Sequence, residues 1–435
     1  MTRNLYPTIL RGLLVTSAMS VTLLASAQKF VCGPPEVNEA GAIQLEAKSI
    51  FSASTSGFDL NSQPEVMNGF CSSNQPFFFS VALPEGSYRV TVEFGSSRPS
   101  DTTVRAEARR LMAEHVVTTA SDPATRIFDV NLRTPQIGAD VHRQVKLKAR
   151  EVGNLDWDGK LTLEFNGDHP SIHSIAIEPV RETTIYLAGD STVVDQDLEP
   201  WAAWGQMLPR FFAPGVVIAN HAESGETIRS FNGELRLEKI MSLIQPGDYL
   251  LLQFGHNDQK PNAVSPADYK ALLIAAIAKT RAMGATPILV TSMNRRTFDS
   301  AGKITDSLAP YPQTMREVAA AQQVALIDLN AMSKTLFEAM GPNLAMKAFM
   351  HYPAKSFPHQ DQAISDDTHF NSYGAYELAR CVVRGMREAK LPLVEFLRPD
   401  AAAFDPARPD PQPLFHLPAT PIPMKSADVT KTPQI

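Results

Sequence analysis

The pattern of hydrophobic residues changes near residue 181, and this change constrains the fold more than any other feature. Across residues 88–94 and 161–165, apolar and polar side chains alternate, which is the pattern of a strand with one buried face. After Arg181, apolar residues form short unbroken runs separated by longer helical stretches. Unbroken runs are typical of strands buried on both faces. The sequence therefore predicts an all-β part over residues 28–181 and an α/β part over residues 182–391.

The α/β part is predicted to contain a parallel sheet. Its strands are expected at the apolar runs 184–188, 216–219, 249–254, 287–291 and 324–329. Residues 265–283 show a helical pattern that Ser265 can cap and Gly284 can end, and a last helix is predicted over residues 372–389. Because strands alternate with helices, the runs should form βαβ units of a doubly wound sheet.

The all-β part is predicted to be a sandwich or jelly roll, because its short strands are separated by turn residues. Cys32 and Cys71 both lie in this part. The sequence leaves open whether they form a disulfide or remain two buried thiols. Cys381 lies among apolar residues of the last predicted helix and is expected to be a small core residue.

The two ends of the chain carry different signals. Residues 1–27 resemble a secretory signal, with arginines before an apolar run at 13–24 and small residues at 25–27. That run is shorter than the roughly 20 residues of a membrane span, so export is favoured over an anchor. We therefore expect a secreted or periplasmic protein with no membrane contact after signal removal. Residues 392–435 hold 10 of the 33 prolines and are expected to be extended, either wrapping the surface or disordered.

Polar residues follow the first strands of the predicted parallel sheet, where ligands bind in such folds. Ser191 follows the first strand, Gly225 the second and Asn257 the third. All these loops open on the same edge of the sheet. If the strand order is 2-1-3, the loops are also neighbours. This placement predicts a site that contains all three residues.

The residue types fit nucleophilic catalysis on an ester. Ser191 can attack a carbonyl if His369 takes its proton, and Asp366 can accept from the other ring nitrogen of His369. Asp367 is the alternative partner, but its side chain should point away from the ring in a tight turn of the same loop. The backbone N–H groups of Ser191 and Gly225 and the side-chain amide of Asn257 can form an oxyanion hole.

Each block also has a simpler interpretation as a turn, a polar loop or the N-terminal cap of the last helix. Rival chemistries lack support, because the chain has no Gly-x-Ser-x-Gly elbow, no His-Glu-x-x-His, no P-loop and no dinucleotide fingerprint. His351, His359 and Asp361 could bind a metal, but their spacing matches no metal template and solvated loop residues are favoured. A formal net charge of −6 gives no basic footprint for nucleic acid.

Taken together, these blocks resemble the SGNH (GDSL-type) hydrolase superfamily, and their flanks resemble its rhamnogalacturonan acetylesterase branch. The matching blocks are Gly189-Asp190-Ser191-Thr192-Val193, Gly225 within residues 222–227, Phe254-Gly255-His256-Asn257-Asp258 and Asp366-Asp367-Thr368-His369-Phe370. Thr192 stands where the family name has leucine. The resemblance spans about residues 183–390. It implies a flavodoxin-like three-layer αβα fold and a serine esterase that needs neither metal nor cofactor. The substrates implied are O-acetyl groups on plant pectin.

The β part resembles galactose-binding-like modules that precede such domains. Trp157 with Asp158 could form a sugar platform, although a half-buried aromatic residue is favoured. Trp201 and Trp204 could line a substrate groove or anchor the following helix in the core. The sequence thus predicts an exported carbohydrate O-deacetylase that acts on acetylated polysaccharide or oligosaccharide. The alternatives are an esterase for acetylxylan or lipid and a non-catalytic carbohydrate-binding protein. The oligomeric state is left open.

Overall fold

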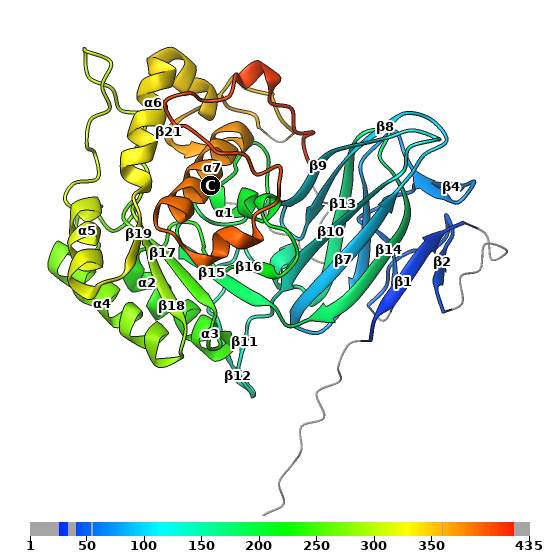
Figure 1. Ribbon diagram of the computed structural model, residues 1–435, viewed down its shortest axis with the longest axis horizontal. Helices are drawn as coiled ribbons and strands as arrows, with labels where there is room; N and C mark the ends of the chain where they lie inside the picture. The colour runs from blue at the N-terminus through cyan, green and yellow to red at the C-terminus, as the bar shows by residue number, and fades with distance from the viewer. Residues whose placement is uncertain (1–25, 34–40, 54, 359, 422–435) are drawn as a thin grey trace, which may run out of the picture.

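A computed structural model describes residues 26–33, 41–53, 55–358 and 360–421 of this chain. Most of the predicted signal segment, His359 and the last part of the tail lie outside these ranges. An all-β part lies beside an α/β part (Figure 1). No helix within the described ranges is long and apolar enough to cross a bilayer.

The β part is a sandwich of two sheets, as predicted. One sheet has the order β10-β7-β14-β1-β2, with β5 also paired to β14 and β4 to β5. Its strands are β1 (Gln28–Cys32), β2 (Ile43–Leu45), β4 (Glu65–Met67), β5 (Phe70–Ser72), β7 (Gly86–Phe94), β10 (Ala124–Leu132) and β14 (Ser171–Val180). The other sheet has the order β3-β6-β13-β8-β9. Its strands are β3 (Ser56–Asp59), β6 (Phe77–Ala82), β8 (Ser100–Ala106), β9 (Arg110–Thr118) and β13 (Lys160–Asp168).

The core of the sandwich explains the alternation in the sequence. Along β7, every second side chain is buried while those between are half-buried. Phe30 of β1 meets Phe79 of β6 with ring centroids 4.9 Å apart, which joins the two sheets. Cys32 and Cys71 form a disulfide with Cα atoms 5.4 Å apart, which settles the pairing that the sequence left open.

The α/β part has a parallel sheet with the order β16-β15-β17-β18-β19. Its strands are β15 (Thr183–Gly189), β16 (Val216–Asn220), β17 (Tyr249–Gln253), β18 (Thr286–Val290) and β19 (Ala325–Ile327). The first strand is therefore flanked by the second and third, so the condition for neighbouring loops, a 2-1-3 order, is met. The last strand is shorter than expected, because the side chain of Asp328 accepts from the N–H of Ala331 and Leu329 begins the next helix.

Helices cover both faces of this sheet (Figure 1). They are α1 (Trp204–Met207), α2 (Ile228–Gly233), α3 (Arg236–Leu243), α4 (Pro266–Ala282), α5 (Tyr311–Gln322), α6 (Leu329–Ala345) and α7 (Ser372–Glu388). Ile185 and Leu187 of β15 pack in the core formed with α1, α6 and α7. Tyr186 and Ala188 pack in the core formed with α3, α4 and α5. The predicted three-layer αβα fold is confirmed, and its two buried faces account for the unbroken apolar runs.

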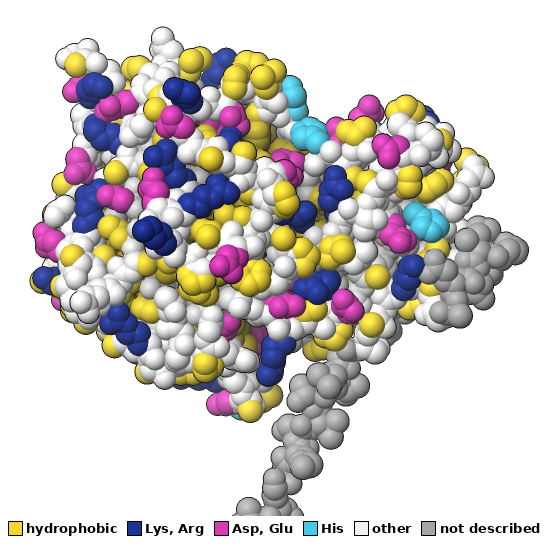
Figure 2. Space-filling model, in the orientation of Figure 1, with side chains coloured by type: hydrophobic (Ala, Val, Ile, Leu, Met, Phe, Trp, Pro, Cys, Tyr) yellow, Lys and Arg dark blue, Asp and Glu magenta, His cyan; other side chains and the backbone are white. Residues whose placement is uncertain are grey.

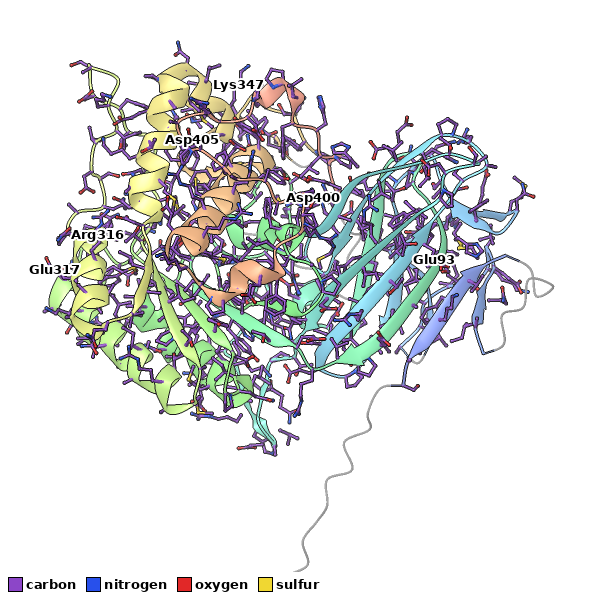
Figure 3. All side chains as sticks on the ribbon, in the orientation of Figure 1. Glu93, Arg316, Glu317, Lys347, Asp400 and Asp405 are labelled. Atoms are coloured by element: carbon purple, nitrogen blue, oxygen red, sulfur yellow. A yellow bond between two sulfur atoms is a disulfide. The ribbon has the colours of Figure 1, made fainter. Side chains whose placement is uncertain are left out.

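The proline-rich tail wraps the surface as far as residue 421. The His115 side chain on β9 contacts the carbonyl of His416 at 2.6 Å, and Thr420 donates its hydroxyl to Glu164 at 2.9 Å. Arg210 binds both Glu114 of β9 and Asp400 of the tail, at 2.7 and 3.0 Å. Asp400 lies where the tail passes between the two parts of the molecule (Figure 3). The tail therefore ties the α/β part to the sandwich.

The disulfide should stabilise the sandwich. It closes a sequence separation of 39 residues, which corresponds to about 4 kcal/mol of lost unfolded-state entropy. Replacing Cys32 and Cys71 with serine should lower the free energy of unfolding by about 2–4 kcal/mol, measured by guanidinium titration. The double variant should not respond to reductant, while the natural protein should. Equal stability of the two proteins under oxidising conditions would contradict this prediction.

Candidate active site

Ser191 lies in a tight turn directly after β15. Val193 donates its N–H to the carbonyl of Asp190 at 3.0 Å, and the Asp190 carboxylate accepts from the Thr192 hydroxyl at 2.7 Å. At Gly189 a Cβ would lie 2.5 Å from a methyl carbon of Val193, so only glycine permits this close turn. The Ser191 side chain is thereby fixed at the carboxyl end of the strand.

His369 is presented by a bulge, where a loop was expected. The strands β20 (Phe349–Tyr352) and β21 (Ile364–Phe370) form an antiparallel pair. Phe349 lies opposite Phe370, but Met350 lies opposite Asp366, so the residues between Asp366 and Phe370 are extra on one strand. The extra residues place His369 at the site. The N-terminal cap of α7 is Asn371, so the block 366–369 is not that cap.

The structure brings Ser191, His369 and Asp366 into one hydrogen-bonded chain. Ser191 Oγ lies 2.8 Å from His369 Nε2, and His369 Nδ1 lies 2.7 Å from Asp366 Oδ2. The other carboxylate oxygen of Asp366 accepts the backbone N–H groups of Thr368 and His369 at 2.7 and 3.0 Å. A ring that donates from Nδ1 to a carboxylate leaves Nε2 free to accept the serine proton.

The charge of Asp366 is stabilised by these contacts. Burial alone would raise the pKa of Asp366, but the hydrogen bond and charge of His369, together with the backbone donors, hold that pKa well below its usual range. Asp366 therefore stays a carboxylate at neutral pH. It can stabilise a positive charge on the His369 ring when that ring takes up a proton.

Asp367 faces away from His369, as the sequence reasoning favoured. Its carboxylate accepts from Arg296 Nε at 2.6 Å and contacts His351 Nε2 at 2.7 Å. His351 is therefore engaged with Asp367. Within the part of the chain that the structure describes, no group of three or more His, Cys, Asp or Glu side chains could hold a metal ion.

The other predicted residues lie beside Ser191. The register pairs Gly189 with Gln253 and Leu187 with Asn220, so the loops after β15, β16 and β17 begin at one edge. Gly225 adopts a φ of +80°. Among the described residues, no acceptor takes the backbone N–H of Ser191 or Gly225.

Asn257 is tied to the loop that carries Gly225. Its Nδ2 donates to the carbonyl of Glu226 at 3.0 Å. An amide nitrogen has two N–H donors, so one remains for a ligand. The arrangement can supply three donors to a developing negative charge at Ser191.

A buried polar cluster beneath these loops was not singled out from the sequence. Asp190 Oδ2 lies 3.5 Å from His256 Nδ1, and Asp258 accepts the N–H of Ile228 at the start of α2 at 2.9 Å. Burial raises the pKa of Asp258 to about 7, and the nearby charge of Asp190 adds to the shift. Asp190, His256 and Asp258 lie within the sequence blocks that carry the family resemblance, and this was the signal that could have pointed to them.

Of the three tryptophans singled out from the sequence, Trp204 has the core role. Trp204 is fully buried and donates from Nε1 to Gln253 at 2.8 Å, so it anchors the core. Trp157 is half-buried beneath the Arg133 guanidinium, 4.6 Å from its ring centroid. Trp201 is half-buried, and its carbonyl accepts from Arg109 at 2.8 Å.

A notch separates the sandwich from the α/β part on the face in view in Figure 2. A cavity of about 440 Å³ lies between β8, β9, the tail and the start of α7. Asn371, which follows His369 by two residues, is part of its wall together with Glu199 and Tyr352. Lysine and arginine side chains are interspersed with acidic ones over the face in Figure 2.

Comparison with known proteins identifies the family. The model of the GDSL-like Lipase/Acylhydrolase family matches residues 187–376. Rhamnogalacturonan acetylesterase RhgT of Bacillus subtilis (strain 168) is 42% identical over 216 residues, which cover 49% of this chain and 93% of that protein. This chain belongs to the GDSL-like lipase/acylhydrolase family. It is a carboxylic ester hydrolase.

Two further similarities accompany this assignment. The probable rhamnogalacturonan acetylesterase YesY of Bacillus subtilis (strain 168) is 35% identical over 217 residues, covering 48% of this chain and 95% of that protein. The crystal structure of protein YxiM from Bacillus subtilis covers 84% of this chain and 99% of its own chain, with 25% identity and a TM-score of 0.47. The family resemblance stated from the sequence blocks is confirmed.

The raised pKa of Asp258 gives a pH dependence of stability. In the unfolded chain this carboxyl ionises near its ordinary pKa of about 3.9, whereas in the folded protein it stays protonated up to about pH 7. The unfolded state therefore gains stability relative to the native state as pH rises through this window. Relative to the natural protein, Asp258→Asn should become more stable as pH rises from about 4 to 7, measured as the difference in Tm.

Asp268→Asn is the matched control, because this carboxylate is exposed on α4 and pairs with Arg229. Its Tm difference from the natural protein should stay nearly constant across the same window. A constant difference for Asp258→Asn as well would contradict the assigned shift.

Proposed function

We propose that Ser191, His369 and Asp366 are the catalytic residues of an acyl-enzyme mechanism. Ser191 Oγ attacks the ester carbonyl while His369 Nε2 takes its proton, and Asp366 stabilises the resulting positive ring. The N–H groups of Ser191 and Gly225 and the amide of Asn257 stabilise the oxyanion. The observation that carries this proposal is the continuous hydrogen-bonded chain from Ser191 through His369 to Asp366.

The remaining steps, departure of the alcohol and hydrolysis of the acyl-enzyme, use the same groups. His369 gives its proton to the leaving alkoxide, and the C–O bond to the alcohol breaks, leaving an acyl group on Ser191. Water then attacks this ester while His369 takes a proton from the water. When the tetrahedral intermediate collapses, Ser191 recovers its proton and the acid is released.

For the substrate we propose O-acetyl groups on carbohydrate, and acetylated rhamnogalacturonan in particular. The support comes from two relatives named as a rhamnogalacturonan acetylesterase and a probable one, which match this chain over 93% and 95% of their own lengths.

We also propose that the protein is exported. The signal-like composition of residues 1–27 supports this, and so does the Cys32–Cys71 disulfide, because disulfides persist in oxidising compartments. A signal-peptide fusion to a periplasmic reporter would test the proposal, since a reporter retained in the cytoplasm would contradict it.

Substitutions in the hydrogen-bonded chain should separate the roles. Ser191→Ala and His369→Ala should each lower kcat on an aryl acetate by about 10⁶-fold, and Asp366→Asn by about 10⁴-fold. Asp367→Asn is the matched control, because this carboxylate contacts Arg296 and His351 and not His369. Its kcat should stay close to that of the natural protein. Residual activity of Ser191→Ala well above that of Asp366→Asn would refute the assignment of the nucleophile.

A substrate panel tests the second proposal. Acetate release from acetylated rhamnogalacturonan should exceed that from acetylated xylan at equal acetyl content, and a chelator should leave both rates unchanged. The Ser191→Ala protein serves as the blank. Faster release from xylan would overturn the proposed substrate, while strong inhibition by the chelator would overturn the metal-free mechanism.

A further inference from the structure

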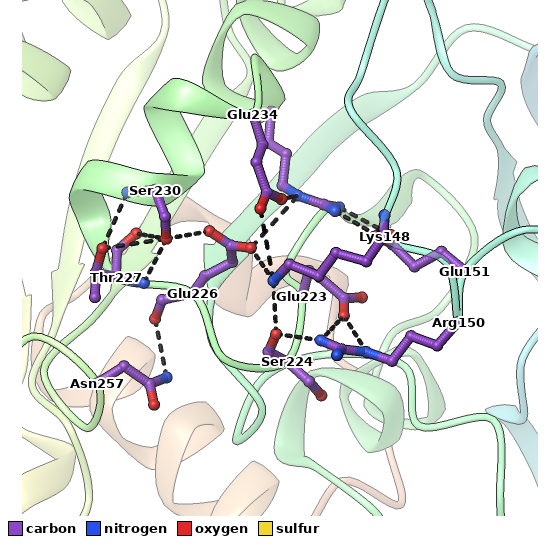
Figure 4. Close-up of polar contacts among 11 residues, drawn as sticks. Lys148, Arg150, Glu151, Glu223, Ser224, Glu226, Thr227, Ser230, Glu234 and Asn257 are labelled. Carbon is purple, nitrogen blue, oxygen red and sulfur yellow. Dashed lines mark hydrogen bonds and ion pairs between the residues drawn. The ribbon is translucent and has the colours of Figure 1, made fainter. Parts of the chain in front are cut away.

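A segment of the sandwich part reaches the loop that carries Gly225. It comprises residues 145–151, which lie between β12 (Asp140–Gln144) and β13. Lys148 Nζ donates to the carbonyl of Ser224 at 2.8 Å, and the Arg150 guanidinium donates to the same carbonyl. Figure 4 shows both side chains converging on residues 223–226.

The carbonyl of Ser224 and the N–H of Gly225 belong to the same peptide group. A peptide group is planar, and in the trans form its C=O and N–H point in opposite directions. Two cationic donors on the Ser224 oxygen therefore fix the direction of the Gly225 N–H on the other side. They also polarise the peptide group, because a hydrogen bond accepted at its C=O strengthens the bond that its N–H donates.

Glu226, the residue after Gly225, is also fixed by hydrogen bonds and an ion pair. Its fully buried carboxylate contacts Lys148 Nζ and accepts the Ser230 hydroxyl at 2.5 Å. Its backbone carbonyl accepts from Asn257 Nδ2 at 3.0 Å. Lys148 thus contacts both neighbours of Gly225, and through Glu226 it also acts on the residue that carries the amide donor (Figure 4).

We propose that Lys148 and Arg150 are positioning residues for the oxyanion hole, so that the sandwich part completes the active site. The inference rests on the proposed role of Gly225 as a donor to the oxyanion. Neither side chain needs to touch the substrate, because each acts through the peptide group between Ser224 and Gly225. The effect should appear mainly in the transition state, where the oxyanion carries its charge.

The alternative role for these side chains is simple docking of the two parts. Arg143 of β12 tests that alternative, because it crosses the same junction and binds Glu238 of α3 at 2.9 and 2.7 Å. The Arg143–Glu238 pair does not involve the Ser224 carbonyl or Glu226. If these side chains only dock the two parts, substitution of Arg143 should lower kcat as substitution of Lys148 or Arg150 does. If they position the oxyanion hole, only substitution of Lys148 or Arg150 should lower kcat.

The test compares Lys148→Met, Arg150→Met and Arg143→Met in the full chain, with kcat and KM on an aryl acetate and Tm for each. Removal of one oxyanion donor costs about 10²–10³-fold in kcat, so loss of an orienting contact should cost about tenfold or more. KM should change by less than about twofold, as for an interaction made only in the transition state. Lys148→Arg, which retains a cationic donor, should recover most of the kcat.

An inhibitor readout separates positioning from a general structural effect. A boronic acid that bonds to Ser191 places a tetrahedral anion in the oxyanion hole, so its inhibition constant should rise by about the factor by which kcat/KM falls. Arg143→Met should leave kcat and this constant unchanged. Equal losses in Lys148→Met and Arg143→Met, or an unchanged kcat in folded Lys148→Met, would overturn the proposal.

A second variant covers the case in which Lys148→Met does not fold, because it leaves the buried Glu226 carboxylate without its ammonium partner. Lys148→Met combined with Glu226→Gln removes that charge and still lacks the donor to Ser224. This double variant should fold and still show the lowered kcat, and full activity in it would also overturn the proposal. Activity of Ser191→Ala is the separate result that would refute the proposed mechanism itself.

Discussion

The site depends on the alignment of three parallel strands at one edge of a sheet. Because β15 lies between β16 and β17 in register, the loops that carry Ser191, Gly225 and Asn257 begin side by side. Both faces of this sheet are buried under helices, so the strand ends are held rigidly. Backbone and amide donors positioned in this way need no reorganisation when charge develops, which is the main source of electrostatic catalysis.

The remaining parts of the site come from outside the sheet. The β20–β21 pair supplies His369 and Asp366 on a bulge, and the sandwich supplies charged side chains to two of the loops. Arg110 of β9 binds Asp195, which follows Ser191 by four residues, at 2.9 Å. This pair is almost fully buried, and breaking such pairs is costly because a charge is left without a partner. The sandwich is therefore built into the framework around Ser191.

The local pattern of the sequence was enough to predict the parallel sheet and the hydrogen-bonded chain, whereas the order of the strands entered only as a condition for the loops to be neighbours. Ser191, Gly225 and Asn257 each lie in the loop that follows an apolar run, so the strand ends define where they lie. The preference for Asp366 over Asp367 followed from a tight turn, and the observed partners of the two carboxylates agree with it. The bulge was not predicted, because a shift of register depends on the partner strand and leaves no local periodicity. The contacts of residues 145–151 with the loop after β16 could not be predicted from the sequence either, since they join segments more than 70 residues apart.

The central claim is that Ser191 is made nucleophilic by His369. An aryl organophosphate that phosphorylates an activated serine tests this claim directly, with the modified peptide located by mass spectrometry. We expect one adduct on Ser191, formed rapidly in the natural protein and very slowly in His369→Ala. An adduct on another residue, or labelling of Ser191 at the same rate without His369, would contradict it.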